Sequence, residues 1–103
     1  MADAFDFTTS KILDWELEKI HNALLREEIR ISRHARDAAK DDNISLVQLL
    51  ETILIGTPVS KDLANNALER IPGINFEHRI DNRWIRVKVA WFEHYIVVTA
   101  YQI

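Results

Sequence analysis

The chain has 103 residues, of which 48% are apolar and 28% are charged, a composition typical of one globular domain. It contains no cysteine, which excludes disulfides, thiolate catalysis and thiolate-bound metals. The net charge of −3 argues against a general nucleic-acid-binding protein. No apolar stretch approaches the length of a membrane span and the N-terminus lacks a secretory pattern, so we expect a cytoplasmic protein without membrane contact.

The charge is unevenly distributed along the chain. Residues 1–69 carry a net charge of −5, whereas residues 70–103 carry +2. The concentration of cations in the C-terminal third indicates a site there. The alternative is that the helices of the first two thirds simply carry their carboxylates on solvent-facing surfaces.

The first third is expected to contain an arm and a helix. Residues 1–7 predict a flexible arm, which Phe5 or Phe7 can pin. Residues 8–28 predict an extra N-terminal helix from about Thr9 to Glu28, with Thr8, Thr9 and Ser10 as candidate N-caps. Its apolar stripe consists of Leu13, Leu17, Ile20 and Leu24. The sequence leaves open whether residues 29–32 are extended or continue this helix.

Two further helices have clear start signals. Ser32 is expected to cap a helix from Arg33 to about Lys40. Ser45 and Gln48 fit the capping box of the next helix. The inward-facing residues of that helix are predicted to be Leu46, Leu49, Leu50, Ile53 and Leu54. Gly56 and Pro58 end it, and residues 60–70 predict a fourth, weaker helix.

The last third alternates as three strands, 74–80, 83–92 and 95–102. A turn at residues 81–82 pairs Glu77 with Arg86. A turn at residues 93–94 pairs Phe92 with Tyr95, and further along it pairs Lys88 with Thr99 and Arg86 with Tyr101. We therefore expect an α+β fold in which N-terminal helices pack on a small C-terminal antiparallel meander, within a single domain 1–103.

The predicted registers gather polar side chains on one face of the sheet. Glu77 can accept the proton of a 2′-hydroxyl, Arg86 can stabilise a phosphorane, and Tyr101 or a histidine can protonate the leaving oxygen. His34 is the candidate histidine, because it begins a helix where anions bind. The RNA-binding candidates around them are Arg79, Trp84, Lys88 and Thr99. The alternative is that Glu77 and Arg86 form a structural ion pair, with Tyr101 packed over the arginine stem, and that His34 makes a structural hydrogen bond.

Cofactor and metal motifs are not found in the sequence. The chain has no His-x-x-x-His or His-x-His pattern and no clustered carboxylates. With two glycines, it also has no Gly-rich phosphate loop. We therefore expect a site that works with no cofactor and no metal.

Three short motifs carry a resemblance. They read Ile-Ser-Arg-His-Ala over 31–35, Ile-Ser over 44–45 and Val-Val-Thr-Ala-Tyr over 97–101. In this order they resemble a prokaryotic family of small domains of unknown function, which is related to RelE-type toxins, barnase, EndoU and colicin-type ribonucleases. The resemblance implies a RelE/barnase-like, toxin-like domain over residues 29–103, with His34, Thr99 and Tyr101 at matching positions. Members usually carry an arginine-rich helix and Glu-Arg-Gly before the second motif, where this chain has Asp-Ala-Ala-Lys-Asp-Asp-Asn over 37–43.

These observations define three hypotheses. The first is a metal-independent endoribonuclease of toxin–antitoxin type that cuts single-stranded RNA on the sheet face and has a cognate antitoxin as partner. The second is a non-catalytic protein-binding module on the same fold, with Trp15, Trp84 and Trp91 as anchors. The third is a homodimer whose seam is the apolar stripe of the first helix.

Overall fold

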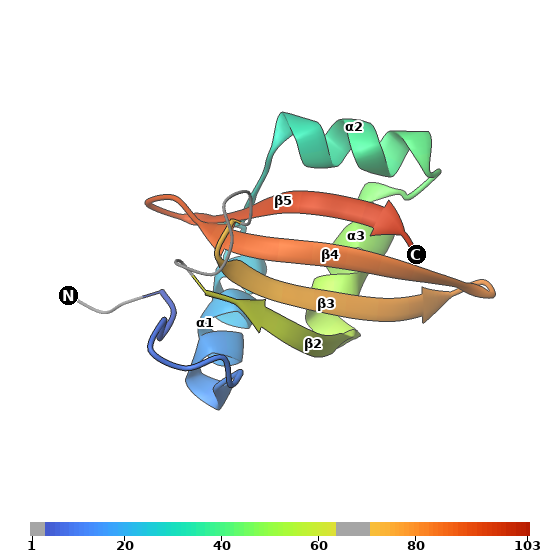
Figure 1. Cartoon of the computed structure of the whole chain (residues 1–103). Helices are drawn as coiled ribbons and strands as arrows, with labels where there is room; N and C mark the ends of the chain where they lie inside the picture. The colour runs from blue at the N-terminus through green and yellow to red at the C-terminus, as the bar shows by residue number, and fades with distance from the viewer. Residues whose placement is uncertain (1–3, 64–70) are drawn as a thin grey trace.

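The computed structural model describes residues 4–63 and 71–103 and confirms an α+β architecture, with three helices and five strands in these ranges. The helices are α1 (Asp14–Leu25), α2 (Arg33–Asp41) and α3 (Leu46–Ile55). The strands are β1 (Arg30–Ile31), β2 (Thr57–Asp62), β3 (Gly73–Ile80), β4 (Arg83–Trp91) and β5 (Tyr95–Gln102). They form one mixed sheet in the order β1-β5-β4-β3-β2 (Figure 1).

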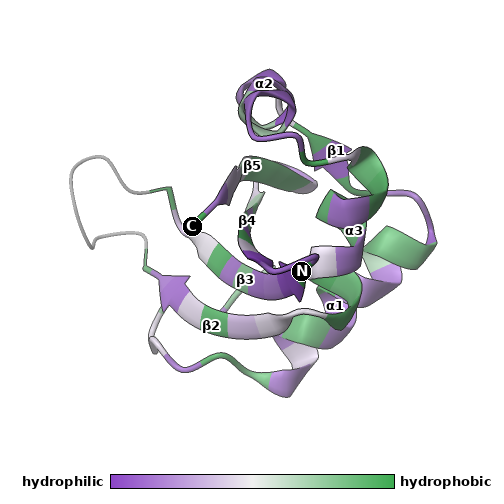
Figure 2. Ribbon diagram, turned by 90° about the vertical axis from the view of Figure 1, so that its right-hand side faces the viewer, coloured by the Kyte–Doolittle hydropathy of each residue, from purple (hydrophilic) through white to green (hydrophobic). Residues whose placement is uncertain are grey.

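The three helices of the described residues leave one face of the sheet without a covering helix. Helices α1 and α3 lie on the same side of the curved sheet (Figure 2), and α2 runs alongside β5 (Figure 1). The core fills the space between the sheet and these helices; its largest fully buried apolar side chains are Phe5, Ile20, Leu49, Ile53, Ile74, Phe76, Ile85, Val87, Val89 and Val97. The opposite surface of the sheet, here called the open face, faces the viewer in Figure 1.

The first helix is shorter than the sequence predicts. It begins at Asp14 rather than about Thr9, because the Glu16 carboxylate accepts a hydrogen bond from the Leu13 N–H at 2.8 Å and so fixes the first turn. The expected caps at residues 8–10 are therefore wrong. Phe5 is buried in the core, so the arm is pinned at this residue.

The apolar stripe of α1 packs within the chain. Ile20 is fully buried, and Leu17 and Leu24 pack half-buried against the core cluster. The stripe therefore contributes to the protein's own core rather than offering the exposed seam that a dimer through α1 requires.

The caps of α2 and α3 are confirmed. The Ser32 hydroxyl accepts from the Ala35 N–H at 3.0 Å, and Ser45 and Gln48 form the reciprocal capping box. Leu49 and Ile53 of α3 are buried as predicted.

The inward-facing surface of α3 is narrower than predicted. Leu46 and Leu54 were expected to point inward, but they are 58% and 43% exposed. The sheet covers only the side of α3 that carries Leu49, Thr52 and Ile53, so the adjacent side remains in solvent.

The sheet contains two strands in addition to the three that the sequence predicts. Residues 30–31 form β1, parallel to β5, which resolves the open question about residues 29–32. Residues 60–62, predicted to begin a fourth helix, belong to β2 and pair antiparallel with β3. Pairing with the β3 edge overrides local helix preference here; the remainder of the predicted helix, 64–70, lies outside the described residues.

The β3–β4 hairpin matches its predicted register throughout. Asp81 and Asn82 occupy the turn with φ of 50° and 67°, the left-handed region that a two-residue turn of this kind requires. Glu77 pairs with Arg86, as predicted.

The β4–β5 hairpin differs at its turn. Trp91 pairs with Tyr95, so the predicted pair of Phe92 with Tyr95 is wrong and the loop is one residue longer than expected. A β-bulge at Val98 then restores the register, because Val98 is the extra residue between two paired positions. Both predicted site pairs, Lys88 with Thr99 and Arg86 with Tyr101, are therefore present.

The longer loop also changes which residues of β5 face the core. A two-residue turn at residues 93–94 would place Ile96 and Val98 on the core face, but in the structure Tyr95 and Val97 belong to the core cluster and Ile96 is only partly buried. Val98, the bulged residue, is buried outside that cluster.

Candidate functional site

Three strands of the open face align the predicted catalytic side chains in one row. Arg86 in β4 pairs with Glu77 of β3 on one side and with Tyr101 of β5 on the other. Paired residues of neighbouring strands point to the same face of a sheet. Glu77, Arg86 and Tyr101, here called the polar row, are thus brought together by register alone.

The guanidinium of Arg86 is the centre of the row. Its Nε lies 3.6 Å from Glu77 Oε2, an ion pair between side chains that are 29% and 24% exposed. Its Nη2 donates to Ser60 Oγ at 3.2 Å. Strand β2 therefore contributes to the site through a residue that the sequence did not indicate.

Arg86 Nε has no hydrogen-bond acceptor among the described residues. Among the described side chains, it is the buried polar atom without a hydrogen-bond partner, since 3.6 Å is too long for a hydrogen bond. Buried donors are normally satisfied, and an exception points to strain or function. Arg86 Nε is thus an enclosed, unsatisfied donor at the centre of the site, 3.6 Å from the Glu77 carboxylate.

A second polar row lies beside the first. Lys88 Nζ forms an ion pair with Asp62 Oδ2 at 2.7 Å. The Asn75 amide donates to Ser60 Oγ at 3.0 Å and to Asp62 Oδ2 at 3.2 Å. Thr99 is opposite Lys88 on β5 and is partly exposed. Lys88 and Asn75 are both buried, so this row is firmly held by its neighbours.

Sequence reasoning missed Ser60 and Asp62. The segment containing them was predicted to be helical, and a helix would not have placed them beside Asn75 and Lys88. The available signal was the alternation of Thr57 and Val59, two β-branched residues, with smaller or polar neighbours.

Exposed aromatic side chains lie on the same strands. Trp84, paired with Arg79, is 48% exposed, and Tyr101 is 38% exposed. Arg79 donates to Asn82 at 3.3 Å and is exposed. Rings exposed in this way can stack on unpaired bases.

His34 lies apart from the polar row. Two hydrogen bonds tie the ends of α2 to β5. At its start, the Ser32 N–H donates to the Val97 carbonyl, and at its end the Asp42 carboxylate accepts from the Gln102 N–H. It therefore follows β5 from one end to the other. His34, in the first turn of α2, is near the start of β5, whereas Tyr101 is near its end.

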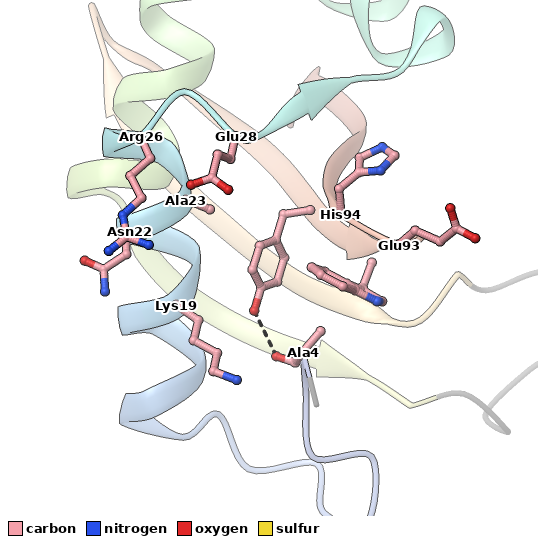
Figure 3. A pocket seen from close by; sticks show the side chains of 10 residues that line it. Ala4, Lys19, Asn22, Ala23, Arg26, Glu28, Glu93 and His94 are labelled. Carbon is pink, nitrogen blue, oxygen red and sulfur yellow. Dashed lines mark hydrogen bonds between the residues drawn. The ribbon is translucent and has the colours of Figure 1, made fainter. Parts of the chain in front are cut away.

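A pocket of about 320 Å³ opens on the other side of the molecule, between α1 and the β4–β5 loop. Its lining combines Trp91 and Tyr95 with residues of both charges, including Lys19, Arg26 and Glu28, and with His94 (Figure 3). The Tyr95 hydroxyl donates to the Ala4 carbonyl at 3.1 Å. Burial, with a smaller contribution from the charge of Glu16, raises the pKa of Tyr95 to about 12.

Within residues 4–63 and 71–103, no group of three or more His, Cys, Asp or Glu side chains is placed to hold a metal ion. No helix in these ranges is long and apolar enough to cross a membrane. Comparisons of the chain with protein families, with curated proteins and with solved structures found no match.

Proposed function

We propose that the protein is an endoribonuclease that cuts single-stranded RNA on the open face without a metal ion. The observation that carries the proposal is the polar row, in which a carboxylate, a guanidinium and a phenol follow one another across three strands. These are the groups that an internal transesterification of RNA needs.

The reaction uses each member of the row once. Glu77 accepts the proton of a ribose 2′-hydroxyl, and the 2′-oxygen forms a bond to the adjacent phosphorus. Arg86 stabilises the added negative charge on the phosphorane oxygens. The bond from phosphorus to the 5′-oxygen then breaks, and Tyr101 donates its proton to that oxygen. The products are a 2′,3′-cyclic phosphate and a 5′-hydroxyl.

The surrounding residues bind the strand. Trp84 supplies an exposed ring on which a base can stack, and Arg79 supplies an exposed cation for a phosphate. Lys88 is held by Asp62, so its contribution is to fix the floor of the site.

A cleavage assay tests the proposal. Purified protein is incubated with a fluorescent single-stranded RNA in EDTA, beside Glu77→Gln and the control Glu18→Gln, which removes an exposed carboxylate on α1. The wild type and the control are expected to cleave, and Glu77→Gln to lose at least about a hundredfold in rate. Equal cleavage by Glu77→Gln would contradict the role of the row.

A second candidate is a non-catalytic protein-binding module. The ion pairs of the open face favour it, because Lys88 with Asp62 and Arg86 with Glu77 already satisfy their charges within the protein. A folded wild type that leaves RNA intact, with and without ribosomes, would select this candidate over the ribonuclease.

A further inference from the structure

Helix α3 carries apolar side chains on the side that the core does not use. Val47 is 72% exposed, and Leu46 and Leu54 are exposed as well, with Leu50 half-buried between them. These four residues, here called the α3 apolar face, recur at the spacing of one side of a helix. Contiguous exposed apolar surface of this kind marks interaction sites.

A pocket continues this face toward α2. It has a volume of about 320 Å³, and its apolar lining consists of Ile31, Ala39, Ile44, Leu46 and Leu49. Leu46 belongs both to the pocket and to the α3 apolar face, so the two form one continuous groove. An apolar side chain projecting from a partner can enter the pocket while its neighbours cover α3.

The charged residues that line the pocket itself have a single sign. Arg36 and Lys40 also line the pocket, both are exposed, and they lie four residues apart on α2, so they flank the same edge. The pocket lining contains no carboxylate. A partner that fits this edge must carry negative charge beside its apolar residues.

We infer that the groove between α2 and α3 binds an amphipathic helix of another protein, with carboxylates along the edge that faces α2. The apolar residues of the partner helix, spaced at i, i+3, i+4 and i+7, cover the α3 apolar face and fill the pocket. Its carboxylates pair with Arg36 and Lys40. The surface shares no residue with the polar row, so it is independent of the proposed ribonuclease activity.

Two synthetic helical peptides test the inference. Both carry the same leucine stripe, and they differ only in whether glutamate or lysine lines one edge. Fluorescence anisotropy with labelled peptide measures binding to the intact protein. The glutamate peptide is expected to bind saturably and at least about tenfold more tightly than the lysine peptide.

Charge reversal provides the decisive variant. Arg36→Glu/Lys40→Glu is expected to reverse the preference between the two peptides. The control Lys11→Glu/Arg26→Glu makes the same change in net charge at exposed positions outside the groove and is expected to leave the preference unchanged. An equal effect of both double variants would overturn the assigned edge.

The apolar contribution is tested at exposed positions, where substitution does not disturb the core. Val47→Gln/Leu54→Gln is expected to abolish binding of the glutamate peptide while the circular dichroism spectrum is retained. Unchanged peptide binding would overturn the inference. A wild type that binds neither peptide would overturn it as well. This includes the outcome in which the wild type forms dimers through the α3 apolar face and Val47→Gln/Leu54→Gln dissociates them.

Discussion

Among the residues that the structure describes, the most completely buried charged side chains form one ion pair. Glu16 and Lys61 have fully buried side chains, and Lys61 Nζ donates to both carboxylate oxygens at 3.0 and 2.9 Å. The same carboxylate also accepts from the Asp6 and Leu13 N–H groups. One side chain thus joins the N-terminal arm, the start of α1 and the edge strand β2.

Lys61→Met leaves this carboxylate without its cation and is expected to lower the free energy of unfolding by about 3 kcal/mol. The double variant Glu16→Gln/Lys61→Met is expected to recover part of the loss, since a glutamine oxygen can still accept from the two N–H groups. Urea denaturation of the four proteins of this cycle measures both effects. A Lys61→Met protein as stable as the wild type would refute the claim that Lys61 neutralises a buried Glu16 carboxylate.

Tyr95 makes the free energy of unfolding decrease at high pH. Its phenol has a raised pKa of about 12 in the folded protein, against 10.0 normally, so folding favours the neutral form. This stabilisation is complete below about pH 10 and is lost as the pH rises toward 12. In the Tyr101→Phe variant, Tyr95 is the remaining tyrosine, so phenolate absorbance reports Tyr95 alone. We expect Tyr95 to ionise near pH 12 in the folded variant and near pH 10 in the variant unfolded by urea. Ionisation of the folded protein near pH 10 would be the contrary result.

At the scale of elements, serine caps differ in what they contribute. Ser45→Ala removes a capping box and is expected to lower the free energy of unfolding by about 1 kcal/mol. Ser10→Ala alters a residue that only the sequence designates as a cap, and α1 begins four residues later. Thermal denaturation should therefore show little change for Ser10→Ala; equal losses in both variants would contradict the observed start of α1.

Sequence patterns predicted some elements well because local chemistry determines them. Asp81 and Asn82 tolerate positive φ, so the first hairpin and its pairs followed from two residues. The second hairpin has a longer loop and a bulge at Val98, and neither has a local signal in the sequence. Their effects on register cancel, which is why Arg86 still meets Tyr101.

Other elements depend on contacts that are distant in sequence. Strand β2 exists because β3 offers it an edge and because Lys61 reaches Glu16, 45 residues earlier. The pairing of β2 with β3 is what places Ser60 and Asp62 in the candidate site. The exposure of Leu46 and Leu54 likewise depends on how little of α3 the sheet covers, which an apolar pattern does not encode.

At the scale of the whole molecule, the two faces of the sheet differ: one packs against helices and the other carries the polar row. One side holds the core under α1 and α3, and the other presents Glu77, Arg86 and Tyr101 in register. The excess of carboxylates in residues 1–69 and of cations in residues 70–103 follows the same division between helices and central strands. An acidic protein can in this way still present cations where we propose that RNA binds.

The chemistry of the cut ends tests the central claim most directly. Mass spectrometry of the RNA products formed in EDTA is expected to find 2′,3′-cyclic phosphates and 5′-hydroxyls, and an RNA methylated at every 2′-oxygen is expected to remain intact. These results follow if Glu77 activates the 2′-hydroxyl and Tyr101 protonates the leaving oxygen. Cleavage of the methylated RNA, or products ending in 3′-hydroxyl and 5′-phosphate, would contradict the mechanism, and no cleavage at all would contradict the activity.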